Sequence, residues 1–482
     1  METSHLHALA VEAMRSRGLL PEFPAEVLAA AEAAGATPQR AGGAVRDLRG
    51  LCWFSIDNDD TRDLDQLSVA EPLAGGAVRL RVAVADVDAL VPRDGPVDRH
   101  AAANTTSVYT AAGVFPMLPE VLSTGLTSLH EGQERLAVVV DMEVQADGSM
   151  GTAHFERALV RNRARLAYDA VSAWLDGGAA LPQLAAVPGL AEQLRLHDAV
   201  AGALRRWRHE RGALDVDTIS ARPVMQDGRL VDLRADERVR AKDLIADLMI
   251  AANTAVARFL TARRFPSLRR FLESPRRWDR IEALAAGYGT TLPAEPDAVA
   301  LHRFLGARRE ADPQGFADLS LRVVKMLGPG VYVAAAPDGE ELGHFGLAVS
   351  NYAHSTAPNR RYPDLVTQRL IKAAIAGAPC PYTLDELQAI ARHCTAQEDN
   401  ANRVERQVLK AAATALLQGR IGDTFDAIVT GASPRGTYVR IARPLLEGRL
   451  VRGTEGADVG DALAVRLVAL DEAQGHIDFE RA

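Results

Sequence analysis

Five aspartates lie within nine residues, from Asp57 to Asp65, directly after an apolar stretch at 51–56. One arginine stands among them, so this acidic segment carries five negative charges and one positive charge. Two carboxylates about 4 Å apart repel each other by roughly 1 kcal/mol in water and by ~4 kcal/mol near a protein surface. Because that repulsion must be offset, the segment is either a solvated loop or a set of oxygen ligands for a divalent cation such as Mg²⁺.

The spacing of these acids helps to choose between a solvated loop and a metal site. An EF-hand calcium loop is excluded, because its sixth position would be Arg62 instead of glycine. Residues 58–60 are turn formers, which favours a loop that leaves a strand. In an extended chain Asp63 and Asp65 point to the same side, and Asp57 reaches them from the end of the strand. Taken alone, these residues leave the solvated turn and the metal site equally open.

A second polar segment, His354–Asp364, places Arg360 beside Arg361 among turn residues, just before an expected helix from Leu365. Adjacent arginines at the start of a helix can donate paired hydrogen bonds to phosphate oxygens. The segment therefore predicts a phosphate contact, with a pair of surface salt bridges as the alternative.

The composition of the chain sets limits on its class. Its 482 residues are 48% hydrophobic and 24% charged, which is typical of a globular protein with two to four domains. The net charge of −8 does not indicate a polyanion-binding protein, although 55 basic residues leave room for local patches. The three cysteines lack the spacing of a zinc site or a disulfide framework. Without a secretory leader or an apolar run of 18 residues, we expect a soluble cytoplasmic protein with no membrane contact.

The elements that must position the polar segments can be read from the pattern of apolar residues. Helices are expected at 3–17 and 25–35, forming a small helical module over 1–48 that is either a helix-turn-helix or a packing element. Residues 49–418 alternate between strand and helix patterns without a linker, which predicts one large mixed α/β (α+β) catalytic domain.

Within that large domain four elements stand out. Apolar, β-branched runs predict buried strands at 80–87 and 136–141. A helix is expected over 241–265, and the capping-box residues at 383–386 predict a long helix that continues towards Gly419.

The last segment, 419–482, differs in character. Five short alternating runs near 424–430, 436–441, 448–452, 461–469 and 476–480 predict an OB-type barrel, a module that often binds single-stranded nucleic acid. We expect Tyr438 to stack on a base and Arg440 to contact phosphates. A barrel with an ordinary mixed surface is the alternative.

Together the acidic and arginine segments resemble the ribonuclease II family of exoribonucleases. The catalytic RNB domain of that family carries a D-x5-D-x-D-D signature and a distant T-S-P-I-R-R/K-Y signature, which match Asp57–Gln66 and Thr356–Tyr362. Further matching segments follow in chain order at 82–87, 107–109, 115–119, 164–168, 211–215 and 249–253. Several ordered matches over most of the chain make a chance similarity implausible.

The resemblance implies roles for the residues at the signature positions. Asp57, Asp63 and Asp65 would hold Mg²⁺, with Asp63 and Asp65 catalytic and Asp65 essential. Gln66 stands where the signature has a fourth aspartate, so one anionic metal ligand becomes a neutral amide oxygen. Arg360 would clamp the scissile phosphate and stabilise its developing charge.

Contacts with RNA are implied for Tyr109, Tyr168, Asp247, Arg361 and Glu405. Tyr109 would stack on the 3′-terminal base, a contact worth ~1 to 3 kcal/mol, and Tyr168 would lie near the same nucleotide. Asp247 stands where the family often has a glutamate that recognises ribose, and Glu405 would lie near the cleaved end. Packing and helix-surface charge are the alternatives for both tyrosines and for Glu405.

Two further departures from the family pattern concern the path of the RNA. Val216 stands where some relatives have a second base-stacking aromatic residue. The family usually has cold-shock barrels ahead of the catalytic domain, where this sequence has about 50 residues of helical character. We therefore expect RNA to reach the site differently and structured RNA to be tolerated.

The function implied by the resemblance is processive hydrolysis of single-stranded RNA from its 3′ end to nucleoside 5′-monophosphates by a monomeric, Mg²⁺-dependent enzyme. A different class of function is a non-catalytic RNA-binding protein that retains the fold, for which Gln66 is the argument.

Overall fold

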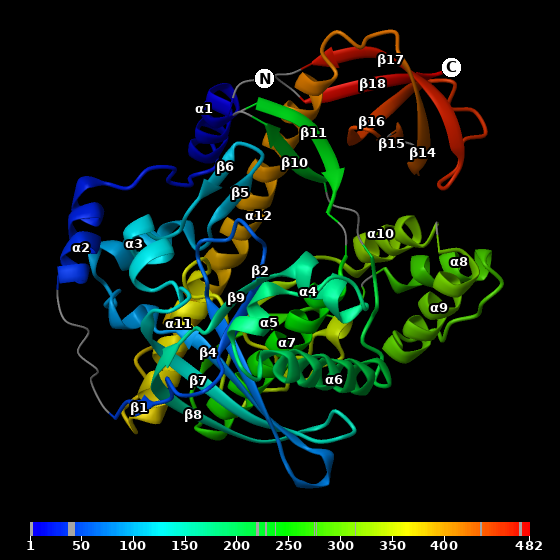
Figure 1. The fold of residues 1–482 in the computed structure, drawn as a ribbon. Helices are drawn as coiled ribbons and strands as arrows, with labels where there is room; N and C mark the ends of the chain where they lie inside the picture. Colours follow the sequence, from blue (N-terminus) through cyan, green and yellow to red (C-terminus); the bar gives the residue numbers. More distant parts are fainter. Residues whose placement is uncertain are drawn as a thin grey trace.

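The computed structural model describes residues 3–36, 44–217, 221–226, 229–236, 238–273, 275, 277–313, 315–433, 436–471 and 475–482. Its centre is a curved, mostly antiparallel sheet of seven strands (Figure 1). From one edge to the other these strands are β1 (Arg46–Asp47), β8 (Met150–Arg161), β7 (Glu134–Val144), β4 (Val78–Ala85), β3 (Gln66–Pro72), β2 (Phe54–Asp57) and β9 (Ala164–Ala167). The two edge strands, β1 and β9, pair in parallel with their neighbours.

The middle of the sheet confirms the two strands expected from sequence, which are β4 and β7. Both are rich in valine, a β-branched residue that packs well on a pleated surface. Nearly all of their central side chains are buried on both faces of the sheet. The acidic segment connects β2 to β3, so its position is set by this buried core.

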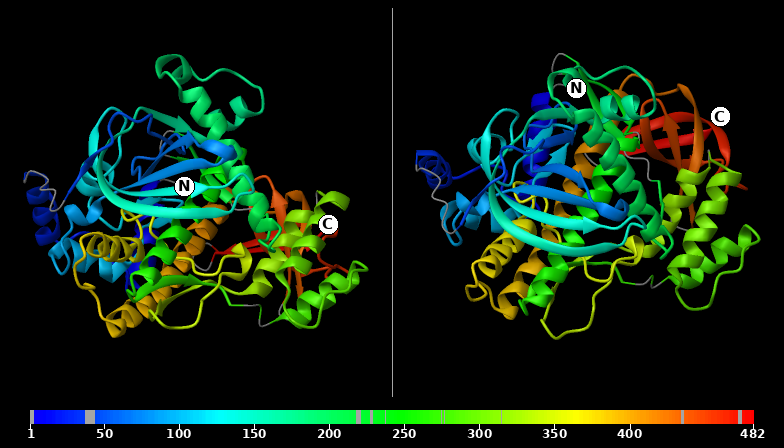
Figure 2. Two further views of the ribbon diagram at one scale, coloured as in Figure 1. Left: turned by 90° about the horizontal axis from the view of Figure 1, so that it is seen from below. Right: turned by 60° about the horizontal axis from the view of Figure 1, so that its bottom comes forward.

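Helix α7 (Arg240–Ala262) confirms the expected helix and contacts four strands of the sheet, with α6 (Leu190–His209) beside it (Figure 2). By length and composition α7 could cross a membrane, but 67% of its apolar window is buried inside the protein. It is the core helix of this domain, and among the described residues no other helix meets the same criteria.

Helix α12 (Leu384–Leu416) begins at the expected capping box, in which Thr383 and Glu386 bond each other's backbone amide. With 33 residues it is about 50 Å long. It packs against α11 (Tyr362–Ile375), β5 (Val108–Thr110) and β13 (Val331–Ala335), and its far end reaches the C-terminal barrel. It therefore connects the catalytic domain to that barrel.

The C-terminal segment forms the five expected strands, closed into a barrel in the order β14, β15, β16, β18 and β17. Their bounds are β14 (Thr424–Ser433), β15 (Gly436–Ala442), β16 (Leu445–Arg452), β17 (Ala462–Asp471) and β18 (His476–Arg481). The barrel core continues into Val404 and Val408 of α12. The barrel is thus packed onto the catalytic domain.

The two helices expected at the N-terminus are present, and they pack into different cores. Helix α1 (Thr3–Arg15) buries Leu6 and Met14 in the core shared by α12 and the barrel. Helix α2 (Ala25–Ala36) packs on α3 (Pro96–Asn104) and on the core of the large sheet. Each apolar face finds a separate partner, so the helices serve as packing elements and do not form a helix-turn-helix.

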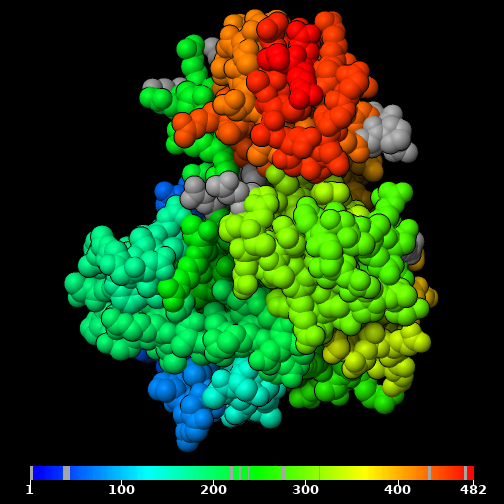
Figure 3. All heavy atoms as spheres, turned by 90° about the vertical axis from the view of Figure 1, so that its right-hand side faces the viewer, coloured from blue at the N-terminus to red at the C-terminus, as the bar shows by residue number. Residues whose placement is uncertain are grey.

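Three helices form a small unit that the sequence did not reveal: α8 (Trp278–Gly287), α9 (Ala298–Ala311) and α10 (Phe316–Leu327). Their buried residues form a hydrophobic core of their own. The unit lies directly below the barrel (Figure 3), and an ion pair of 2.8 Å from Arg440 of β15 to Asp318 of α10 joins the two.

Candidate active site

The ends of two parallel strands bring Asp57 and Tyr168 together. In the register of β2 and β9, Asp57 stands opposite Ala167. The residue after Ala167 is Tyr168, which begins α4 (Tyr168–Leu175). Since parallel strands end at the same edge of a sheet, both side chains line one cavity there.

The loop from Asp57 to Asp65 is held by neighbours from elsewhere in the chain. Ser128 Oγ donates to the Arg62 carbonyl and accepts from the Leu64 amide, each at 2.9 Å. Arg165 donates to two backbone carbonyls of the same loop, at 2.6 and 2.8 Å. Asp59 and Asp60 are exposed, whereas Asp65 is only 3% exposed. The loop therefore separates two solvated acids from the buried ones.

The arginine segment meets the acidic segment at Asp65. The backbone amide of Asn359 donates to Asp65 Oδ1 and Arg360 Nε donates to Asp65 Oδ2, each at 3.1 Å. The Asn359 side chain contacts the Thr127 hydroxyl at 2.5 Å. Residues about 295 positions apart in the chain are thus joined at one carboxylate.

Backbone contacts also position Tyr109 beside Arg360. The Ser107 amide donates to the Arg360 carbonyl at 3.0 Å, which places strand β5 beside the arginine segment. Glu405 of α12 accepts a hydrogen bond of 2.9 Å from the Tyr109 amide. Tyr109 itself is 43% exposed. Glu405 thus contacts the backbone of Tyr109, and its expected place near the cleaved end of the RNA stays a prediction.

These side chains line two neighbouring cavities that share Tyr109 and Arg360. The first, about 190 Å³, is called the acidic cleft here and is lined by Asp57, Asn58, Thr61, Asp63, Asp65, Gln66, Tyr109, Tyr168 and Arg360. The second, about 130 Å³, continues along α12 past Arg361, Asn402 and Glu405. The fold thus brings together nine of the sequence-predicted residues: the four at metal positions, Arg360, Arg361, Tyr109, Tyr168 and Glu405.

The acidic cleft has too few positive charges for its carboxylates. Burial, and then repulsion from Asp65, raise the pKa of Asp57 to about 7. Burial raises the pKa of Asp65 to about 6 and also raises the pKa of Asp63. Although burial opposes it, the charge of Asp65 raises the pKa of Arg360, which stays protonated. One buried acid, Asp65, and two half-buried acids, Asp57 and Asp63, therefore share the guanidinium of Arg360.

The donor atoms of the cleft fit a hard divalent cation. Asp57 Oδ2 is buried and has no hydrogen-bond partner among the described residues. Carboxylate and amide oxygens are the ligands that Mg²⁺ prefers. Among the described residues, no three acidic, histidine or cysteine side chains are yet close enough to hold a metal ion. Asp57, Asp63, Asp65 and Gln66 are the residues of the cleft that would hold a cation.

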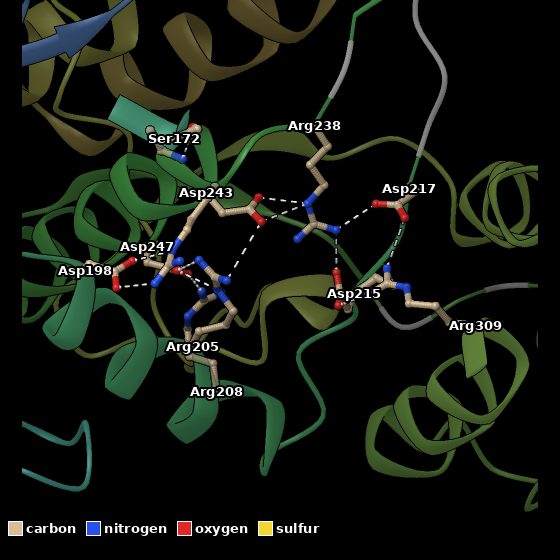
Figure 4. A network of polar contacts seen from close by, with 12 residues as sticks. Ser172, Asp198, Arg205, Arg208, Asp215, Asp217, Arg238, Asp243, Asp247 and Arg309 are labelled. Carbon is tan, nitrogen blue, oxygen red and sulfur yellow. Dashed lines mark hydrogen bonds and ion pairs between the residues drawn. The ribbon is translucent and has the colours of Figure 1, made fainter. Parts of the chain in front are cut away.

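Two residues predicted to contact RNA form ion pairs within the protein and lie outside the acidic cleft. Asp247 lines a different cavity and is paired with Arg208 and, at 2.7 Å, with Arg205, so its oxygens are not free for a ribose hydroxyl (Figure 4). Arg440 is paired with Asp318 and is 14% exposed in its side chain, because the barrel rests on α10 there. Its guanidinium is not available to phosphate.

The remaining residues of the predicted RNA path lie in three different parts of the structure. Tyr438 is 38% exposed on the barrel, away from the acidic cleft. Arg361 pairs with Asp364 at 2.7 Å, so it shapes the turn next to Arg360. Val216 packs against the core of the three-helix unit. Of the two adjacent arginines, Arg360 alone reaches Asp65.

Sequence reasoning missed the residues that hold the loop in place, Thr127, Ser128, Arg165 and Asn359. Asn359 lies inside the arginine signature, at the position that the signature fills with isoleucine, and this difference was a usable signal. Ser128 and Arg165 bond backbone atoms of the acidic loop, and Thr127 bonds the Asn359 side chain. Because these partners are distant in the chain, the sequence holds no pattern for them.

Comparison with known proteins gives two family matches. The RNB domain model matches residues 45–377, and the model of the RNase II-type exonuclease C-terminal S1 domain matches residues 423–482. The chain is 31% identical over 515 residues to ribonuclease R of Vibrio cholerae, covering 97% of this chain and 61% of that protein. It is 29% identical to ribonuclease R 1 of Lactococcus lactis, covering 98% and 60%. The chain thus spans about three fifths of the length of these relatives.

Solved structures show the same fold. The apo form of Mycoplasma genitalium RNase R superimposes with a TM-score of 0.86 at 22% identity, covering 98% of this chain and 77% of that chain. Yeast Ssd1, described as a pseudonuclease, gives 0.65 at 16% identity, covering 88% and 53%. With both signatures meeting in one cleft and the RNB model matching most of its length, this chain belongs to the RNB-domain family of ribonuclease II-type exoribonucleases.

Proposed function

We propose that this protein is a hydrolytic 3′ to 5′ exoribonuclease that degrades single-stranded RNA processively to nucleoside 5′-monophosphates with Mg²⁺. The observation that carries the proposal is the meeting of Asp57, Asp63, Asp65 and Arg360 in one cavity. The relatives from Vibrio cholerae and Lactococcus lactis, which are named ribonuclease R, support it.

The shape of the site favours action at a chain end. A cleft of about 190 Å³ accepts about one nucleotide, and the second cavity of about 130 Å³ extends it along α12. Tyr109 stands where the two cavities join and offers its exposed ring to a base. A strand that ends in the cleft fits this arrangement, whereas a duplex does not.

Each group of side chains has its own role in the proposed reaction. Arg360 binds a nonbridging oxygen of the scissile phosphate and stabilises the charge that develops there. The carboxylates of Asp57, Asp63 and Asp65, with the amide oxygen of Gln66, would hold Mg²⁺, which polarises the phosphate and activates water when bound. Tyr109 and Tyr168 orient the terminal nucleotide.

Tolerance of structured RNA is part of the proposal. A duplex must be separated before one strand reaches a cleft of this size. RNase R of Mycoplasma genitalium, which shares the fold, has been solved in complex with double-stranded RNA. We also propose that the protein is monomeric and cytoplasmic, which light scattering after gel filtration and cell fractionation would test.

The test uses a 5′-labelled linear RNA, a circular RNA of the same sequence, and Mg²⁺. The linear RNA should shorten in single-nucleotide steps to a short limit product, and the circular RNA should stay intact. Internal cuts in either RNA contradict exonucleolytic action. Chelation of the metal should stop the reaction.

The second candidate, a non-catalytic RNA-binding protein, is favoured by Gln66 and by the shared fold of a pseudonuclease. It predicts that native protein and Asp65→Asn bind RNA equally and that neither degrades it. Activity in the native protein that is lost in Asp65→Asn excludes this candidate.

A further inference from the structure

A third cavity, separate from the acidic cleft and from its extension along α12, lies between α6, α7 and the turn that connects β7 to β8. Its volume is about 250 Å³, and none of its lining residues lines the acidic cleft. Drug-sized ligands occupy roughly 300 to 1,000 Å³. This cavity lies just below that range, so it fits a small ligand such as a single nucleotide.

Its walls are held rigidly by close packing. Gly148, in the β7–β8 turn, has a φ of +87°, and a Cβ there would lie 2.1 Å from the Ala203 carbonyl of α6. Ala348, on the opposite wall, has a φ of +51°, which is uncommon for a residue with a side chain. A pocket whose walls cannot collapse is available to a ligand without a large rearrangement.

The charged lining of this cavity is mainly positive, since three arginines face one carboxylate, Asp247. Arg258 is exposed and forms no ion pair with any residue that the structure describes. Arg208 is 9% exposed, and its Nε donor has no hydrogen-bond partner among the described residues. Arg211 is the third. An anion with several oxygens would satisfy these donors.

The rest of the lining is apolar and aromatic. Trp207 contributes its ring, with Arg211 stacked 3.8 Å from the ring centroid. Leu204 and Ile250 add aliphatic surface. A ligand that joins a phosphate to a flat aromatic base matches both halves of the cavity.

Asp247 holds the positively charged Arg208 side chain of the cavity in position. It pairs with Arg208 from within the cavity wall and with Arg205 behind it (Figure 4). This pairing fixes the Arg208 guanidinium through its Nη2 atom, and its buried Nε has no hydrogen-bond partner among the described residues. Asp247 is therefore a positioning residue of this cavity.

We propose that this cavity binds a nucleoside 5′-monophosphate, with the phosphate on Arg208 and Arg258 and the base against Trp207. That such a ligand is also the released product of the enzyme rests on the proposed function. The binding itself does not depend on hydrolysis.

The experiment is calorimetric titration of the full-length, metal-free protein with adenosine 5′-monophosphate, adenosine and inorganic phosphate. The monophosphate should bind at one site and more tightly than either fragment. Arg258→Ala should weaken its affinity about tenfold, which is the loss of one charge-assisted hydrogen bond. The control Arg303→Ala removes an exposed arginine of α9 and should bind as the native protein does.

Two further variants locate the site. Arg360→Ala alters the acidic cleft and should leave binding unchanged, whereas Trp207→Phe should abolish the ligand-induced change in tryptophan fluorescence. Adenosine binding as tightly as its monophosphate, inorganic phosphate binding as tightly as the monophosphate, or loss of binding in Arg360→Ala instead of Arg258→Ala would each overturn the proposal. RNA degradation is measured separately in Mg²⁺. Binding without degradation refutes the proposed function alone, and degradation without binding refutes this site alone.

Discussion

In the acidic cleft three carboxylates, one buried and two half-buried, face one guanidinium. Beside the three-helix unit, in contrast, Asp215 and Asp217 each contact two arginines, Arg238 and Arg309 (Figure 4). Arg238 Nη1 lies 2.7 Å from a carboxylate oxygen of both acids. Both clusters are partly or fully buried and both join segments that are distant in sequence. They differ in whether each charge has a partner.

The pKa values of Asp57 and Asp215 reflect this difference in charge pairing. In the cleft, burial and repulsion from Asp65 raise the pKa of Asp57 to about 7. Burial would also raise the pKa of Asp215, but hydrogen bonds from Arg309 and Arg238 hold it well below its usual range. Paired acids stabilise a fold, whereas unpaired buried acids destabilise it and are kept where they serve a function. The acidic cleft is the candidate active site for that reason.

The largest effect is expected from Asp65→Asn, which removes a buried charge that contacts Arg360. Degradation of 5′-labelled RNA should fall on the order of a thousandfold, because the proposed metal site loses an anionic ligand and the metal's stabilisation of the reacting phosphate weakens. RNA binding, measured by fluorescence anisotropy, should persist. Asp59→Asn changes an exposed acid of the same loop and should keep activity. Comparable losses in both variants would contradict a distinction between solvated and buried acids.

A smaller loss, about a hundredfold in kcat, is expected from Arg360→Ala, which removes the one guanidinium of the cleft. Arg62→Ala removes an arginine of the acidic loop whose side chain is 67% exposed, and it serves as the control. Single-turnover assays at saturating RNA would separate this effect from binding. An unchanged kcat in Arg360→Ala would mean that the Arg360 charge only offsets the charges of the cleft carboxylates and does not act on the phosphate.

The comparison itself is tested by a pair of variants in metal-free protein, Asp57→Asn and Asp215→Asn. A carboxyl whose folded pKa is raised loses stability as pH rises from its unfolded pKa to about 7. Asp57→Asn should therefore raise the free energy of unfolding at neutral pH by about 1 to 3 kcal/mol and remove that pH dependence. Asp215→Asn should lower it by about 1 to 3 kcal/mol, since two arginines lose a charged partner. Urea unfolding monitored by circular dichroism would measure both, and shifts of the same sign would refute the contrast.

The smallest effect is expected from Gln66→Asp, which adds a negative charge to the cleft beside Asp65. The Mg²⁺ concentration for half-maximal activity should fall by up to about tenfold, equivalent to ~1.4 kcal/mol. Gln66→Glu should lower it less, because its longer side chain places the charge differently. An unchanged Mg²⁺ titration would show that position 66 does not contact the metal.

Much of the fold could be predicted from the sequence, because the patterns that indicate its strands and helices are local. Valine-rich runs predicted β4 and β7, the capping box at Thr383 predicted α12, and glycine-separated runs predicted the barrel strands. The three-helix unit was missed, since its helices have no signature that separates them from the surrounding domain. The N-terminal helices were found, but their partners were not, because an apolar face does not specify which core it joins.

The sequence by itself determined the chemistry available to this protein: a dense set of acids, a pair of arginines, and aromatic residues at ordered spacings that identify the family. Only the tertiary structure decided which charges remain without partners. It gave Asp247 and Arg440 their own ion pairs and left Asp57 with an unpartnered oxygen among the described residues. The reason is physical, since the partner of a buried charge comes from residues distant in the chain, and pairing at 3 Å depends on a packing that no local pattern encodes.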